Sequence, residues 1–384
     1  MARVREAGAR LCCRLQVYVG RATPCLLAAA LLLASGCKQG QLAREVQPGS
    51  ESPRDPNPEA GPGSALSSDM GGFWLPALES GSDNSVPAPP AGSYLDGLTV
   101  DPLYRESSKW LFDQYYTASE GVDVGWTGDL ATCDAGTTSA ALRDAVLRRV
   151  NYFRVMAGVP AIVSLIDEYS DLAQRAALMM SVNGRLGHWP DEAWGCYSVE
   201  GYEGASHSLL FLSGSAGEAV DAYVEDRGGG NGFVPHRRML LYPHTKSMGT
   251  GDVPPGDHHM AANALWVLGA MSVQRPETRD GFVAWPPPGY VPHQVVFPRW
   301  SLSHPEADFA AATVSMASQG REFPLRLLPV VDGFGENTIV WEPSIEASAR
   351  PTVDRWLSVE VRDVLVGKRT YNFSYTVIVY DPAS

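Results

Sequence analysis

The sequence predicts an α+β domain followed by an all-β domain, and three observations lead to this fold class. Apolar residues recur at helical spacing through residues 138–183. Strand-like runs follow between residues 247 and 268, which gives one domain both element types. Beyond residue 280 only short alternating apolar runs remain, with turn residues between them. The chain has 384 residues, of which 45% are hydrophobic, enough for the cores of about two domains.

Composition and charge exclude several classes of protein. The 43 Asp and Glu residues outnumber the 30 Lys and Arg residues, and the formal charge is −13. This charge argues against nucleic acid as a partner, because phosphate binding needs a cationic surface. The 38 Gly and 29 Pro residues exclude a single long helical bundle, since both residue types interrupt helices. Six Cys residues are too few for a disulfide-built scaffold.

Residues 1–36 have the design of a signal peptide. Five Arg residues and one Glu precede an apolar run over residues 25–34, which is too short for a membrane-spanning helix. The segment Leu33-Ala34-Ser35-Gly36-Cys37 resembles a bacterial lipobox, with Ala34 where Leu is usual. The resemblance implies cleavage before Cys37 and attachment of lipid to that residue. The alternative is a plain secretory signal, cleaved near Ala34 or Gly36.

The expected mature chain is a lipoprotein of the cell envelope, outside the cytoplasm and anchored to a membrane through Cys37, with the outer membrane or the cell surface expected. Its formal charge becomes −17, because the signal peptide removes five Arg and one Glu. Residues 37–94 are rich in Gly, Pro, Ser and acidic residues and lack apolar periodicity, which predicts a disordered tether. No other stretch is apolar enough to span a membrane.

Cys133 and Cys196 are the thiols that remain once the signal peptide is removed and Cys37 carries lipid. In an oxidising compartment, two thiols in one domain are expected to form a disulfide. Two free buried cysteines are the alternative. We expect a structural bridge and no redox role, because the pair does not form a Cys-x-x-Cys motif.

The central domain is expected over residues 95–272 and to contain four helices. Thr138 or Ser139 caps the first, which reaches Arg154 and stops before Gly158. Apolar spacing and stop signals give the other three helices and two strands. The helices are expected over residues 166–182, 216–225 and 235–241, and the strands over residues 247–253 and 264–268.

Three blocks of this domain stand out by their order and spacing. The first is Asn151-Tyr152-Phe153-Arg154 with Gly158. The second is the helix 172–180 leading to Gly187-His188. The third is the block 234–243 around His236, followed by Gly249-Thr250-Gly251. Together, over residues 139–270, they resemble the CAP superfamily, which contains cysteine-rich secretory proteins, antigen-five allergens and plant pathogenesis-related proteins.

The resemblance implies a CAP-like three-layer α-β-α sandwich with a cleft lined by two His and two acidic residues. By position, the histidines fall on His188 and His236, and the acids on Glu203 and Asp226. The chain departs from the family in lacking the Gly-Glu-Asn segment at residue 203 and in having Tyr223 where Trp is common.

Two imidazoles and two carboxylates can bind a ligand, or they can hold a divalent metal ion such as zinc with His188 and His236 as its ligands. A carboxylate near a bound water could also act as a general base. The structural alternative is that the histidines cap helices and tie loops together. The chain has no Gly-x-Ser-x-Gly, His-Glu-x-x-His, phosphate-loop or dinucleotide motif. This disfavours the hydrolases with clear signatures.

Residues 280–384 are expected to form an immunoglobulin-like β-sandwich after the stiff boundary at residues 285–289. No site chemistry is visible in this region. The expected strands cover residues 294–297, 311–316, 325–330, 338–341, 356–361 and 371–380.

The leading hypothesis is an envelope lipoprotein that binds a lipid, a glycan or another protein at the cleft, without catalysis. A metal-dependent hydrolase using the same cleft is the first alternative. A structural surface protein with a vestigial cleft is the second.

Overall fold

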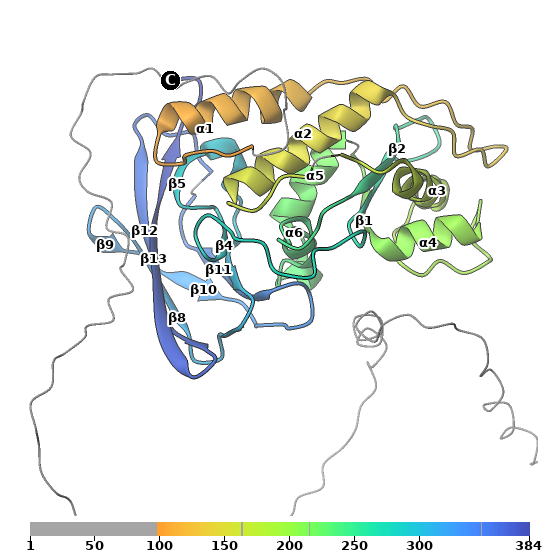
Figure 1. Cartoon of the computed structure of the whole chain (residues 1–384). Helices are drawn as coiled ribbons and strands as arrows, with labels where there is room; N and C mark the ends of the chain where they lie inside the picture. Colours follow the sequence, from red (N-terminus) through yellow and green to blue (C-terminus); the bar gives the residue numbers. More distant parts are fainter. Residues whose placement is uncertain (1–97, 163, 215, 347) are drawn as a thin grey trace, which may run out of the picture. The chain divides into compact units, whose positions relative to one another are not determined.

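The computed structural model describes residues 98–162, 164–214, 216–346 and 348–384, which belong to one compact unit (Figure 1). The predicted signal peptide, the lipidation site Cys37 and the tether lie outside the described residues. Among the helices of the described ranges, none is both long and apolar enough to cross a membrane. The described part is α+β, as the sequence predicts.

The helices of the first half follow the sequence signals closely. Ser139 caps the long helix α2, with its Oγ accepting a hydrogen bond from the Leu142 N–H at 3.0 Å. Helix α3 ends at Gly184, which has a φ of 57°. The α-helices are α1 (Arg105–Leu111), α2 (Ala140–Met156), α3 (Asp167–Asn183), α4 (Val199–His207), α5 (Ala216–Glu225) and α6 (Pro235–Leu240). Shorter helical turns cover Phe112–Tyr116, Thr117–Ser119, Gly229–Asn231 and His293–Val295.

A small antiparallel sheet lies between two helical layers (Figure 1). Its strands are β1 (Ser208–Leu212), β2 (Gly249–Val253) and β3 (Ala262–Trp266), in the order β1-β3-β2. Alternate residues of β3 face opposite layers: Ala264 packs in the cluster that contains α3, and Leu265 packs in the cluster that contains α2 and α5. This alternation produces the three-layer α-β-α arrangement, with α3 and α4 on one side.

Two glycines allow the close approach of the layer formed by α3 and α4. A Cβ on Gly251 of β2 would lie 2.2 Å from the backbone nitrogen of Gln174 in α3. A Cβ on Gly204 of α4 would lie 2.0 Å from the carbonyl oxygen of Leu172 in α3. Neither position has room for a side chain, so glycine determines how closely α3 can pack against the sheet and against α4.

The C-terminal region is all-β and sandwich-like. One sheet has the strand order β10-β11-β6-β4 and the other β5-β13-β12-β8-β9, with β7 paired to β12. The prediction of a strand at residues 294–297 is wrong, because His293–Val295 form a 3-10 turn. The strands are β4 (Val283–Trp285), β5 (Gly289–Pro292), β6 (Trp300–His304), β7 (Ala307–Asp308), β8 (Thr313–Ser318), β9 (Arg321–Glu322), β10 (Leu325–Leu327), β11 (Asn337–Pro343), β12 (Arg355–Val366) and β13 (Arg369–Tyr380).

The largest buried cluster runs through both regions. Phe153 of α2 packs against Trp285 of β4, with ring centroids 5.0 Å apart. Ser108 of α1 donates a hydrogen bond to the Tyr290 carbonyl of β5 at 2.8 Å, and Arg105 lies over the ring of Tyr380. The predicted division at residues 272–280 therefore separates two architectures that share one core. As a folding boundary it stays a prediction.

Candidate functional site

A cleft in the described part has a volume of about 570 Å³ and lies beside α5, between the segment that precedes α4 and the start of α6. This volume falls in the usual range for small-molecule sites. Its apolar surface comes from α5, β1 and the 184–198 loop. The residues of that surface are Leu186, Leu210, Phe211, Ala222 and Tyr223. The polar residues at the cleft are His188, Ser213, Glu218, Asp221, Glu225, Arg227, Asn231 and His236.

His236 reaches the cleft because Asp226 holds it from behind. The Asp226 side chain is fully buried, and its Oδ1 lies 2.7 Å from His236 Nδ1. Its Oδ2 accepts hydrogen bonds from the backbone N–H groups of His236 and Arg237, at 2.8 and 3.1 Å. The same carboxylate thus accepts hydrogen bonds from backbone N–H groups in the first turn of α6 and orients the imidazole ring. Because Nδ1 of His236 is engaged by Asp226, Nε2 is the ring nitrogen left for a ligand.

Helix α5 supplies the carboxylates of the cleft. Glu218, Asp221 and Glu225 recur every three or four residues and lie on the face of α5 that lines the cleft, while Val220 and Val224 are buried on the opposite face. The start of the helix is fixed from β2, where Asp252 Oδ1 accepts a hydrogen bond from the Ala216 N–H at 2.7 Å. Burial raises the pKa of the Asp252 carboxyl.

A buried hydrogen-bond network lies beneath the cleft and fixes Tyr223. The Tyr223 hydroxyl donates to Asn263 Oδ1 at 2.8 Å. Asn263 Nδ2 in turn donates to Asp252 Oδ1 at 2.9 Å, and the Thr250 hydroxyl donates to Asp252 Oδ2 at 3.0 Å. Because its hydroxyl is engaged in the core, Tyr223 offers the cleft its ring, whose centroid lies 5.8 Å from that of His236.

The loop over residues 184–198 places His188 at the other side of the cleft. His188 Nδ1 lies 2.9 Å from the carbonyl oxygen of Ala205, near the end of α4. A carbonyl oxygen can only accept, so this contact assigns the Nδ1 proton to the neutral ring and leaves Nε2 as an acceptor. Burial lowers the pKa of His188, the Ala205 contact opposes that shift, and the neighbouring His236 lowers the pKa further.

The disulfide between Cys133 and Cys196 ties the same loop to the segment that precedes α2. The two Cα atoms are 5.2 Å apart, and the bridge confirms the predicted pairing. The Asn183 side chain adds two hydrogen bonds to the backbone of Gly195, each of 3.0 Å. The loop carrying His188 is therefore fixed by a covalent bond, a side-chain clamp and the contact with Ala205.

The C-terminal region fixes the opposite rim of the cleft through Arg299. The Arg299 guanidinium donates to the carbonyls of Asp226, Gly228 and Asn231, with the Gly228 bond at 2.8 Å. Its Nε donates to Glu342 of β11 at 3.2 Å. A residue of the β-region therefore holds the loop that leads to His236.

The structure brings three of the four predicted cleft residues together. His188 and His236 line the cleft, and Asp226 lies directly behind His236. Glu203 does not line it: the side chain is exposed on α4, and its carbonyl accepts a hydrogen bond from the Ser206 hydroxyl at 2.9 Å. The role of Glu203 in ligand binding stays a prediction.

Sequence reasoning missed Glu218, Asp221 and Glu225. Their spacing of three and four residues along the expected helix 216–225 was the available signal. It did not distinguish a cleft-lining face from a solvated one. That distinction needs the packing of α5 against β1, which brings Phe211 and Tyr223 together at the floor of the cleft.

The metal ion stays a prediction, and the donor atoms of the two histidines show how far the residues present would fit one. Both histidines have Nδ1 engaged, and a His held by a carboxylate is typical of metal-bound imidazole. However, the described residues contain no group of three or more His, Cys, Asp or Glu side chains placed to hold a metal ion. Catalytic zinc sites use three protein ligands. The residues present thus fit such a centre incompletely, and we derive no step through a metal.

Comparison with known proteins assigns the domain that carries this cleft. Residues 147–268 match the model of the cysteine-rich secretory protein family, CAP. The chain therefore contains a CAP-superfamily domain, in agreement with the three blocks found in its sequence. A search of curated proteins found no match.

Two of the solved structures that match this chain give low scores. One is PcoC, a methionine-rich copper resistance protein from Escherichia coli, with 12% identity, a TM-score of 0.20, and coverage of 25% of this chain and 92% of that one. Its selenomethionine form gives 13% identity, a TM-score of 0.20, and coverage of 27% and 99%. At these scores the likeness supports no argument about this chain.

Proposed function

We propose that the CAP domain binds a small amphipathic ligand that presents a cationic, hydrogen-bond-donating group. The observation that supports this most directly is the pairing of an apolar floor with the carboxylate face of α5. The ligand would lay its apolar part on Phe211 and Tyr223 and direct its cation to the carboxylates. The sequence allows a lipid, a glycan or a protein as the ligand. Carboxylates beside an apolar floor favour those ligands that carry an amine, and they disfavour neutral glycans.

The state of each carboxylate supports a cationic group. Glu225 is paired with Arg227, and Asp221 with Arg149 at 2.6 Å. Glu218 is exposed and has no hydrogen bond or ion pair within the described ranges. Asp221 Oδ1 is buried without a hydrogen-bond partner there. The Glu218 carboxylate thus remains as a free negative charge at the cleft, and it suits a donor such as an ammonium group.

A panel of three small molecules tests the proposal. Hexylammonium, hexanol and hexanoate share one apolar chain and differ in the charge of the head group. We expect calorimetry to show the tightest binding for hexylammonium and the weakest for hexanoate. Glu218→Gln should weaken hexylammonium binding several-fold and leave hexanol unchanged, and Glu277→Gln, an exposed residue away from the cleft, is the matched control. Equal binding of hexanoate would contradict the proposal.

The second candidate is a metal-dependent hydrolase, and the Asp226–His236 pair is the observation that favours it. Metal analysis of the purified protein separates this candidate from ligand binding, with His188→Ala and His236→Ala as controls. If no divalent ion copurifies and added zinc leaves Tm unchanged, the hydrolase hypothesis is dropped.

We also propose that the protein is a lipoprotein of the cell envelope, attached through Cys37. The Cys133–Cys196 disulfide supports an oxidising compartment, where such bridges persist. Replacement of Cys37 by Ala should abolish incorporation of labelled fatty acid and release the protein from the membrane fraction. Retention of the label on the variant would exclude Cys37 as the lipidation site.

A further inference from the structure

The floor of the cleft is a row of three rings that begins beside a carboxylate. A Cβ on Gly214 would lie 2.8 Å from the Phe211 ring and 3.1 Å from the Glu218 carboxylate, so this ring and this carboxylate meet at one end of the row. The ring centroid of Phe211 lies 6.3 Å from that of Tyr223, which in turn lies 5.8 Å from that of His236. The floor therefore leads from Glu218 to His236.

Helix α5 runs along the cleft and sets the distance between its two ends. Glu218 belongs to the first turn of the helix, and Glu225 is its last residue. At a rise of about 1.5 Å per residue, these two residues are about 10 Å apart along the helix axis. Arg227 follows shortly after the helix and lines the same cleft. The Glu218 end and the Arg227 end are thus separated by about two helical turns.

The two ends offer opposite chemistry to a ligand. The Glu218 carboxylate has no partner within the described ranges. At the other end, Arg227 is paired with Glu225 through Nε, and no hydrogen bond of its Nη1 or Nη2 is found in the described part of the chain. The Arg227 side chain is 80% exposed, whereas that of Glu225 is 14% exposed. Glu225 therefore holds the guanidinium at Nε and leaves both Nη groups free to donate.

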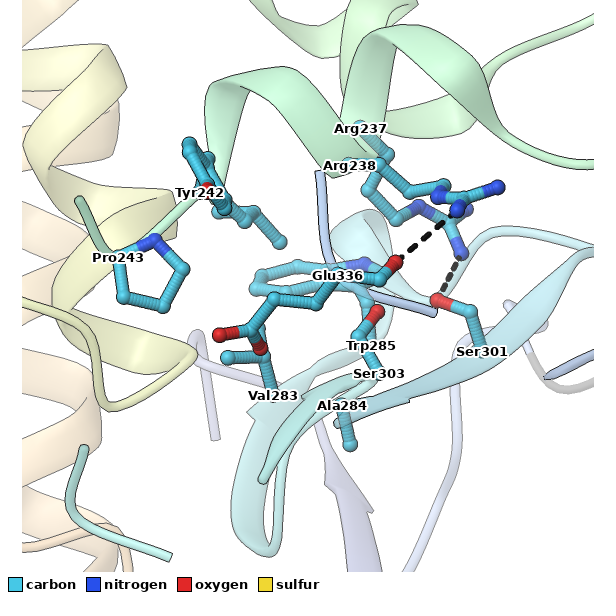
Figure 2. A pocket seen from close by; sticks show the side chains of 11 residues that line it. Arg237, Arg238, Tyr242, Pro243, Val283, Ala284, Trp285, Ser301, Ser303 and Glu336 are labelled. Carbon is cyan, nitrogen blue, oxygen red and sulfur yellow. Dashed lines mark hydrogen bonds between the residues drawn. The ribbon is translucent and has the colours of Figure 1, made fainter. Parts of the chain in front are cut away.

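The arginines of α6 do not add to this end of the cleft. Figure 2 shows the Arg237 and Arg238 guanidinium groups at a separate small cavity beside the β-region. There they donate to the Ser301 hydroxyl and to the Glu336 carbonyl. Arg227, in contrast, is among the residues that line the cleft.

We infer that the ligand is a zwitterion, with an ammonium group at one end of an apolar chain and a carboxylate at the other; this inference rests on the proposed function. The ammonium binds Glu218, the chain lies over Phe211 and Tyr223, and the carboxylate accepts from the two Nη groups of Arg227. A carboxylate suits a guanidinium because it accepts two parallel hydrogen bonds. Glu225 offsets the charge of Arg227, whereas no described group pairs with Glu218, so the ammonium is the stronger anchor.

Calorimetry with ε-aminocaproate, hexylammonium and hexamethylenediamine tests this inference. We expect ε-aminocaproate to bind several-fold tighter than hexylammonium. Hexamethylenediamine should gain nothing over hexylammonium, because its second ammonium meets the Arg227 guanidinium. If hexylammonium binds and ε-aminocaproate binds no tighter, the zwitterion is excluded and the proposed function stands. If none of the three binds, the proposed function fails as well.

Three variants locate the two ends of the ligand. Arg227→Gln should remove the advantage of ε-aminocaproate and leave Glu225 unpaired, so that hexamethylenediamine becomes the tightest of the three ligands. Arg362→Gln is the matched control, because Arg362 is also an exposed arginine paired with a nearby acid, Glu360, and it should keep the wild-type order. Glu218→Gln should weaken all three ligands. An order of affinities that Arg227→Gln leaves unchanged would overturn the assignment of the carboxylate to Arg227.

Discussion

Asp226 shows how a single residue joins backbone strain to site geometry. It has a φ of 58°, and Val234 has a φ of 47°, so a left-handed residue stands on each side of the loop that leads into α6. This conformation is unusual for a buried β-branched residue such as Val234 and is maintained only by the surrounding contacts. The contacts here are the three hydrogen bonds of the Asp226 carboxylate and the Arg299 clamp.

The Asp226 carboxylate is expected to stabilise the fold as well as to orient His236. Asp226→Ala should lower the free energy of unfolding by about 3 kcal/mol, because buried donors of α6 and His236 lose their acceptor. Asp226→Asn should cost less, since Asn tolerates the left-handed conformation and keeps one acceptor oxygen. Urea unfolding measures both. Asp257→Asn, on an exposed loop, is the control. Equal stability of Asp226→Ala and the wild type would show that the carboxylate holds nothing in place.

Protonation of His188 is expected to lower the free energy of unfolding as the pH falls. Its pKa is lowered in the folded protein, chiefly by burial. Below the unfolded value of about 6.5 the unfolded chain therefore binds a proton more readily than the folded one. The contribution of neutral His188 is complete above this pH and is lost as pH falls through the folded pKa. Between pH 8 and 5, His188→Gln should lose less stability than the wild type in urea unfolding. Parallel pH profiles would contradict the prediction.

At the scale of elements, the loop between α3 and α4 is the part of the cleft with least regular structure. Residues 184–198 contain no helix or strand, and one edge of the cleft, Leu186 to His188, belongs to them. Because this loop has no regular backbone hydrogen bonding, the Cys133–Cys196 disulfide fixes its end covalently. Helix α4, which follows, completes the placement through the Ala205 carbonyl.

Removal of the bridge by the double change Cys133→Ser and Cys196→Ser should lower the free energy of unfolding by about 4 kcal/mol on the chain-entropy model, for a sequence separation of 63 residues. It should also weaken hexylammonium binding, because His188 and Leu186 lose their fixed position. Chemical unfolding and calorimetry of the variant measure the two effects. A large loss of stability with unchanged binding would show that the bridge does not organise the cleft.

At the scale of the whole molecule, the β-region acts as a support for the CAP domain. Arg299 holds the rim loop, and Arg237 and Arg238 of α6 bond Ser301, Val331 and Glu336 of the β-region. Aromatic packing between Phe153 and Trp285 continues the core from one region to the other. The two architectures therefore share the interior that positions His236.

This shared interior predicts that the CAP region cannot fold by itself. A fragment of residues 98–272 would remove Trp285 from Phe153 and the Ser301 hydroxyl from Arg237, and it would leave the buried Arg238 guanidinium without its two carbonyl acceptors. We expect it to lack a cooperative thermal transition by circular dichroism, whereas residues 98–384 should show one. A cooperative transition in the short fragment would establish residues 272–280 as a folding boundary.

Much of the fold was accessible from the sequence because its signals are local. Ser139 and Gly184 mark the ends of helices as expected, and residues 216–225 form the predicted helix. Alternation in β12 and β13 likewise predicted strands. Helix α4 and strand β1 were missed, because the short run through residues 199–212 has neither clear helical spacing nor strict alternation. Their existence depends on packing against α3 and β3.

The sequence by itself determined the CAP resemblance, the two cleft histidines and the Cys133–Cys196 pair, since each rests on residue type and order along the chain. Only the tertiary structure decided which acids serve the cleft. Glu203 lies outside its lining, Asp226 stands behind His236, and the face of α5 supplies the carboxylates. The reason is physical: whether a carboxylate is solvated, buried or presented to a cavity depends on packing between elements distant in sequence, which no local pattern encodes.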